Sequence, residues 1–162
     1  MTSADWAKAV RQIKEIGALE SPSRTEDQSI IARFWSDFSY TITPPGHWNQ
    51  IAVAIASDRE YGLMEEAHLL AWLNTAMLDA GVVCWEAKYR YNFWRPITAI
   101  YEADRDGNPE TDPDFEWNSY LESPPHPEYP SGHSSFSGAA ARFLQLYLGE
   151  DAIHFSAISD SV

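Results

Sequence analysis

Two short stretches of the sequence carry side chains suited to binding and protonating an anion. Residues 88–96 read KYRYNFWRP, and residues 130–133 read PSGH. The chain has a formal net charge of -13, yet residues 87–101 contain basic side chains and no acidic one. A locally positive segment in an acidic protein predicts the place where a small anion binds.

The first stretch offers two different cations. Lys88 and Arg95 are seven positions apart, which is roughly 10 Å along a helix and predicts that both lie on one helix face. A guanidinium presents a planar fork of donors to a tetrahedral oxyanion, whereas an ammonium is a movable point charge. Arg90 lies off that face and is expected to matter less. The alternative is a solvated helix face with no ligand.

The second stretch has the pattern of a helix start. Ser131 stands at the N-cap position, Gly132 permits close backbone approach, and apolar residues follow at helical spacing: Phe136, Ala140, Phe143, Leu144 and Tyr147. Free N–H groups at a helix start bind anions, and His133 in the first turn can exchange protons with a bound group. A simple Pro/Ser/Gly turn before a helix is the alternative.

In this order, K-x6-RP and PSGH resemble the first two signature motifs of one superfamily. It contains the vanadium-dependent haloperoxidases and the type 2 phosphatidic acid phosphatases. The longer strings WEAKYRYNFWRP and PPHPEYPSGHSSFSG are more similar to the haloperoxidase branch. The likeness extends from about residue 16 to the last residues. It implies an all-α helical bundle, formed here by a single domain over residues 1–162 that is incomplete at its C-terminus.

The resemblance also implies a role for each residue of the two motifs. Lys88 and Arg95 would neutralise the oxygens of a prosthetic vanadate, and Ser131 and the Gly132 N–H would hydrogen-bond them. His133 would move protons as hydrogen peroxide binds, with Lys88 polarising the peroxide. A halide would then be oxidised to a hypohalous acid or its equivalent, which halogenates a small organic acceptor.

Two further residues are candidates for the halide and substrate pocket. Trp85 precedes Lys88 by three positions, and in the resembling enzymes an aromatic residue here walls the pocket. Its alternative is a core residue. His126 lies in the PPHP run, where those enzymes have Phe in chloride oxidisers and His in many bromide oxidisers. We therefore expect bromide and iodide oxidation rather than chloride, the alternative being a loop histidine packed among prolines.

The third motif of the superfamily, S-R-x5-H-x3-D, is absent. None of the eleven basic residues is an Arg followed six positions later by His. In the resembling enzymes this motif supplies the direct histidine ligand of vanadium, so that ligand is not in this chain. We expect a fragment of a longer reading frame, without turnover of its own and with weak oxyanion binding. Phe136, Phe143 and Tyr147 are expected to form an exposed apolar face that favours self-association.

Two rival functions use the same residues. We call Lys88, Arg95, Ser131, Gly132 and His133 the oxyanion cradle. An acid phosphatase would bind a phosphomonoester in this cradle, since phosphate and vanadate have similar shapes and phosphate competes as an oxyanion. A non-catalytic helical phosphate-binding or interaction domain would bind the anion without chemistry.

Composition bounds the remaining possibilities. A pI near 4.6 argues against nucleic acid and anionic membranes as partners. We expect no transmembrane segment, because no window approaches 18 uncharged apolar residues.

The single cysteine, Cys84, excludes an internal disulfide. The pair Glu65 and His68 has di-iron spacing but lacks a second pair, so His68 is interpreted as structural. The superfamily is often secreted or periplasmic, and the sequence leaves the compartment open.

Hydrophobic spacing predicts the order of the elements. Helices are expected at 4–16, from about 25, at 47–59, and at 63–94 with an interruption near Gly81. Pro96 should end that helix and start a short one. Residues 104–130 contain six prolines and are expected to form a long ordered loop.

Overall fold

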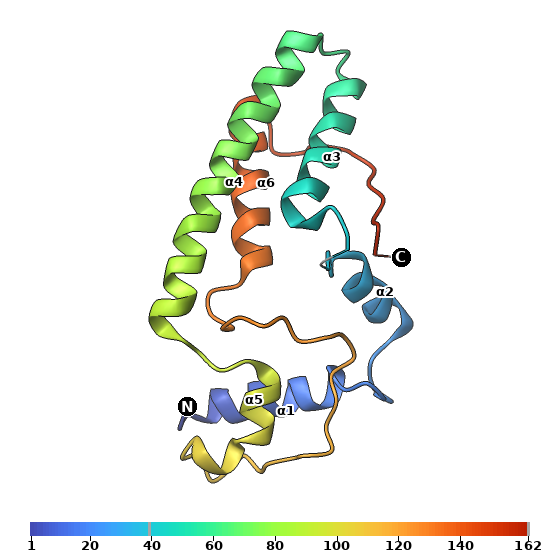
Figure 1. Cartoon of the computed structure of the whole chain (residues 1–162). Coiled ribbons are helices and arrows are strands. Elements are labelled where there is room, and N and C mark those ends of the chain that lie inside the picture. The colour runs from blue at the N-terminus through green and yellow to red at the C-terminus, as the bar shows by residue number, and fades with distance from the viewer. Residues whose placement is uncertain (39, 162) are drawn as a thin grey trace. The chain divides into compact units, whose positions relative to one another are not determined.

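The computed structural model describes residues 1–38 and 40–161, and within them the chain is helical (Figure 1). The helices are α1 (Ala4–Ile16), α2 (Glu26–Phe34), α3 (Thr43–Asp58), α4 (Leu63–Tyr91), α5 (Pro96–Tyr101) and α6 (Gly132–Leu148), with a 3-10 turn, η1 (Ala103–Arg105). The described residues contain no strand, only an isolated bridge between Ala18 and Ser119. The predicted all-α class is confirmed.

The chain forms two compact units. The first unit contains Met1–Ile31 and Lys88–Tyr129, and the second contains Ala32–Ala87 and Pro130–Val162. Helices α2 and α4 each begin in one unit and end in the other.

The core of the second unit lies where α3, α4 and α6 run side by side (Figure 1). Its fully buried side chains recur at helical spacing and include Ile51, Ile55, Leu69, Leu73, Met77 and Leu144. Polar contacts align the same helices. Trp48 Nε1 donates to Ser137 Oγ at 3.0 Å, and the amides of Asn49 and Asn74 exchange hydrogen bonds. The buried apolar faces of α3, α4 and α6 thus pack against each other, and the polar contacts fix their alignment.

Gly81 does not interrupt α4, so that prediction is wrong. The helix runs unbroken from Leu63 to Tyr91. A Cβ added at Gly81 would lie 3.0 Å from Phe136 Cε1 on α6. The glycine is explained by the close approach of an aromatic ring, a tertiary contact that outweighs its poor helix propensity.

The expected apolar face at Phe136, Phe143 and Tyr147 is also not exposed. These side chains are partly buried against the core of the second unit, because α3 and α4 pack over them. Several exposed large apolar residues of this unit lie along α4, namely Trp72, Leu78, Val82 and Val83, and others lie elsewhere, such as Leu146 on α6.

One helical stretch, residues 63–101, is long and apolar enough to cross a membrane by length and composition alone. A core helix of a soluble protein passes the same test, so the expected absence of a transmembrane segment stays a prediction.

Helix α3 starts at Thr43, earlier than the predicted His47. Pro44 and Pro45 lie in its first turn, where a missing N–H leaves no hydrogen bond unmade. His47 is consequently inside the helix, where its Nδ1 lies 3.2 Å from Asp37 Oδ1 and Trp35 stacks on its ring. Both members of the pair are buried, and His47 Nε2 has no partner in the described part of the chain.

The first unit is built on α1 and α5, which pack around Val10, Ile100 and Trp117. The loop after α5 holds the start of α1 through Asp106, whose carboxylate accepts from Trp6 Nε1 at 2.6 Å and Thr111 Oγ1 at 2.9 Å. Burial alone would raise the pKa of Asp106, but these hydrogen bonds and one from a backbone N–H hold that pKa below its ordinary value.

Candidate functional site

Lys88 is placed in the last turn of α4, and its side chain is fully buried. Its ammonium donates to the carbonyl oxygens of Pro127 at 2.7 Å and Glu128 at 3.0 Å. A buried ammonium needs such acceptors, since leaving it unpaired away from water is very costly. The predicted basic stretch is thus fastened to the loop that precedes PSGH.

Arg95 does not share a helix face with Lys88, so that prediction is wrong. Helix α4 ends at Tyr91, and Asn92 adopts a left-handed conformation with φ of 45°. Arg95 is extended, with φ of -69° and ψ of 155°, and caps the start of α5. The physical reason is Pro96, because a residue that precedes proline is disfavoured in helical geometry.

The guanidinium of Arg95 already has an anionic neighbour. Its Nη1 lies 2.7 Å from Glu128 Oε2, and its Nε donates to Ser123 Oγ at 3.3 Å. Glu128 Oε2 is buried yet accepts no aligned hydrogen bond. The Arg95–Glu128 contact is therefore an ion pair without hydrogen-bond geometry.

Glu128 is the site residue that sequence reasoning missed. It lies within PPHPEYPSGH, three positions before Ser131, in a loop where no periodicity predicts contacts. The available signal was an acid close to PSGH, set against a basic stretch that contains no acid of its own.

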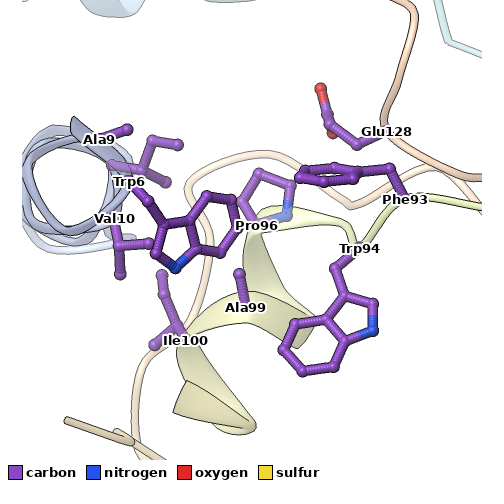
Figure 2. A pocket seen from close by; sticks show the side chains of 10 residues that line it. Trp6, Ala9, Val10, Phe93, Trp94, Pro96, Ala99, Ile100 and Glu128 are labelled. Carbon is purple, nitrogen blue, oxygen red and sulfur yellow. The ribbon is translucent and has the colours of Figure 1, made fainter. Parts of the chain in front are cut away.

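A small apolar cavity of about 70 Å³ lies in the first unit next to Glu128 (Figure 2). Its walls come from α1 and from the segment around α5, including Trp6, Phe93, Trp94 and Ile100. Glu128 is the one charged residue among its lining side chains. The carbon atoms of the Glu128 side chain thus border an apolar region.

The PSGH stretch starts α6 as predicted. Ser131 has the extended conformation of an N-cap, and its Oγ accepts from the Ser134 N–H at 3.2 Å. The first-turn residue His133 is exposed, and its ring nitrogens have no partner in the portion of the chain that the structure describes. An exposed imidazole at the positive end of a long helix can accept and return protons to an anion bound there.

Gly132 is in contact with Trp85. A Cβ added at Gly132 would lie 3.2 Å from Trp85 Cη2, so a larger residue would displace the ring or the turn. Trp85 also packs against Phe136, with ring centroids 5.9 Å apart, and remains partly exposed. The tryptophan therefore lies beside the start of α6, and its role as a pocket wall stays a prediction.

His126 lies in the loop of the first unit and is half-buried. Its Nδ1 is 3.1 Å from the Pro127 carbonyl oxygen, and its backbone N–H donates to Pro124. The structure places it one residue before the carbonyl that binds Lys88. Its influence on halide choice stays a prediction.

The remaining candidates have structural partners. His68 uses both ring nitrogens, one 3.1 Å from Tyr147 Oη and the other accepting from Trp72 Nε1. Cys84 is buried, with its thiol near the Pro130 carbonyl. Within residues 1–38 and 40–161, no cluster of three or more His, Cys, Asp or Glu side chains could hold a metal ion.

Comparisons with known proteins agree with the motifs. The family model described as the VCPO second helical-bundle domain matches residues 68–161. A vanadium chloroperoxidase from Curvularia inaequalis is 32% identical over 169 aligned residues, which cover 90% of this chain and 27% of that protein. A crystal structure described as the first bacterial vanadium-dependent iodoperoxidase matches with a TM-score of 0.69 and 32% identity, covering 90% of this chain and 33% of that one.

The chain thus spans about a quarter to a third of the length of these relatives. The matched region includes both KYRYNFWRP and PSGH. Because the family model covers more than half of the chain, these similarities show that the chain belongs to the vanadium haloperoxidase family.

Proposed function

We propose that this chain forms part of a vanadate-dependent haloperoxidase, which uses hydrogen peroxide to oxidise a halide. The observation that carries the proposal is the start of α6, where a capped helix, an exposed His133 and a glycine packed against Trp85 come together in one unit. These features suit a tetrahedral oxyanion at the helix terminus. The similarity to two vanadium haloperoxidases supports vanadate as that oxyanion.

Two cations of the first unit are proposed as further donors to such a group. Arg95 presents a guanidinium whose Nη1 lies 2.7 Å from a carboxylate oxygen, and this ion pair supports a role in binding an anionic oxygen. Lys88 presents an ammonium at a fixed position, because two carbonyl oxygens orient it. Ser131 and the Gly132 N–H would add neutral donors from the helix start.

Each residue would then do separate work. Vanadate, when bound, activates hydrogen peroxide toward attack by a halide. Arg95 and Lys88 would balance the charge of the oxyanion, and the N–H groups at the start of α6 would orient it. His133 would take a proton from the incoming peroxide and later return one, because an imidazole changes charge near neutral pH.

Halide choice is the finer part of the proposal. We assign it to His126, whose presence favours bromide and iodide over chloride. The two relatives are named for chloride and for iodide, so similarity supports the family and leaves the halide to the local residue.

One experiment separates this function from its rivals. A longer protein that carries this chain together with the third motif should brominate a phenol dye only when vanadate, peroxide and bromide are all present. The same protein should hydrolyse p-nitrophenyl phosphate slowly or not at all. Fast phosphate hydrolysis without bromination would indicate an acid phosphatase. The absence of both reactions would indicate a non-catalytic oxyanion-binding domain.

The matched variants are His133→Ala, which should lose bromination, and Arg90→Ala, which should keep it. Arg90 is a basic residue of the same stretch but lies exposed on α4. A protein whose bromination survives His133→Ala would contradict the proton-transfer role.

A further inference from the structure

Lys88 and Arg95 of the basic stretch contact the same residue, Glu128. Lys88 binds the backbone carbonyl oxygen of Glu128 at 3.0 Å, and Arg95 pairs with its carboxylate at 2.7 Å. The backbone N–H of Glu128 donates to the Phe93 carbonyl oxygen at 3.0 Å. Three contacts thus hold Glu128 against KYRYNFWRP, where an oxyanion would need the same cations.

The way the carboxylate is held matters. Its Oε2 is buried and lies 2.7 Å from Arg95 Nη1, while the carbon atoms of the side chain border the apolar cavity near Phe93 (Figure 2). Burial of this oxygen strengthens its attraction to Arg95, because water screens the two charges less. The oxygen nevertheless accepts no aligned hydrogen bond, and 38% of the Glu128 side chain is exposed, against 22% for Arg95. Charge rather than a network of hydrogen bonds keeps it there, so it can turn toward water.

We propose that Glu128 is an internal competitor of the oxyanion. Its carboxylate pairs with the Arg95 guanidinium when no oxyanion is bound, and this ion pair breaks when an oxyanion binds. This inference rests on the proposed function, because it assumes that Arg95 belongs to the oxyanion cradle. A carboxylate and a tetrahedral oxyanion use the same donors of a guanidinium, and two anions at one fork repel each other.

The competitor role predicts a direction of change in oxyanion affinity that other roles of Glu128 do not predict. If Glu128 competes, replacing it with a neutral residue of the same shape must strengthen oxyanion binding. If Glu128 only orients Arg95 or supports the loop, the same replacement must weaken binding or leave it unchanged. An increase in affinity is therefore the decisive observation.

The test measures the affinity of the 162-residue chain for inorganic phosphate by ³¹P NMR titration, which detects weak binding, and for orthovanadate by calorimetry. Glu128→Gln should bind each anion about three- to tenfold more tightly than the parent chain, since a like charge at the site is removed. Glu128→Asp keeps the charge and should bind no more tightly than the parent. Glu122→Gln, an exposed glutamate of the same loop, is the matched control and should bind as the parent does.

A second variant separates this inference from the proposed function. If Arg95→Ala loses phosphate binding while Glu128→Gln shows no gain, the competitor role is wrong and the cradle stands. If Arg95→Ala binds like the parent, Arg95 is not in the cradle and the proposed function loses its support. Helical circular dichroism verifies each variant, and Glu128→Ala replaces the Gln variant if that one does not fold. No saturable binding by either neutral variant would also overturn the inference.

Discussion

The buried ammonium of Lys88 lies 3.0 Å from the backbone carbonyl oxygen of Glu128 and so attaches the loop before PSGH to the end of α4. The lysine that the family resemblance assigns to the oxyanion therefore has a structural task as well. Two main-chain carbonyl oxygens, those of Pro127 and Glu128, accept from its ammonium.

Lys88→Met should test that structural task. The change keeps a long apolar stem but leaves the Pro127 and Glu128 carbonyl oxygens without their donor. Unsatisfied buried acceptors should lower the free energy of unfolding by about 1–3 kcal/mol, measured by urea denaturation. Arg90→Met, an exposed change on the same helix, should stay within about 0.5 kcal/mol of the parent. Equal stability of the two variants would contradict a structural role for Lys88.

Gly132→Ala should strain the start of α6. The new Cβ would lie 3.2 Å from Trp85 Cη2, so the ring or the turn must shift. We expect a loss of about 1 kcal/mol in unfolding free energy, as for other overpacked sites. Trp85→Phe removes the ring atoms that clash, so the double variant should lose less than the sum of the two single variants. Additive losses in a double-mutant cycle would show that the two residues do not interact.

Asp106 should make the first unit sensitive to acid. Its pKa in the folded protein is below the ordinary value of 3.8. Its contribution is therefore complete above that value and is lost as the pH falls below it toward the folded pKa. Asp106→Asn should reduce stability at neutral pH and flatten this acid-dependent loss. Urea denaturation between neutral and acidic pH measures both, and Asp104→Asn, an exposed change nearby, should keep the parent profile.

The buried pair of Asp37 and His47 should stabilise the second unit. Asp37 has a positive φ of 43°, and its carboxylate lies 3.2 Å from His47 Nδ1. Asp37→Ala removes the acceptor and places an alanine in left-handed geometry, which should cost about 2–4 kcal/mol in total. Asp37→Asn keeps an acceptor and tolerates that geometry, so it should cost less. The order of the two thermal midpoints is the measurement, with Asp58→Ala on the exposed side of α3 as control.

His126 should influence the halide in a longer protein that carries the third motif. The parent is expected to oxidise bromide and iodide with little chlorination, and His126→Phe should shift the ratio of chlorination to bromination upward. Competition assays at neutral pH with equal halide concentrations measure that ratio. Strong chlorination by the parent protein would contradict the assignment.

Much of the helical architecture follows from local signals in the sequence. Ser131 before an apolar repeat, Pro96 after Arg95, and Gly17 after the first stripe each mark a helix boundary that the structure confirms. These signals are readable because they depend on neighbouring residues, through capping hydrogen bonds and the restricted backbone of proline. The two motif strings likewise indicated the vanadium haloperoxidase family without any structure.

The tertiary structure decided what those residues contact. Lys88 and Glu128 are 40 positions apart, Gly81 meets Phe136 across two helices, and Trp85 meets Gly132 in the same way. Spacing along the chain could not predict these contacts, since each depends on how one packed surface fits another. It also could not show that α4 ends at Tyr91, before Arg95. Lys88 and Arg95 therefore do not share a helix face, and both contact Glu128. The sequence by itself determined the family and predicted which residues bind the oxyanion. Only the packing of loop against helix decided which groups contact Lys88 and Arg95.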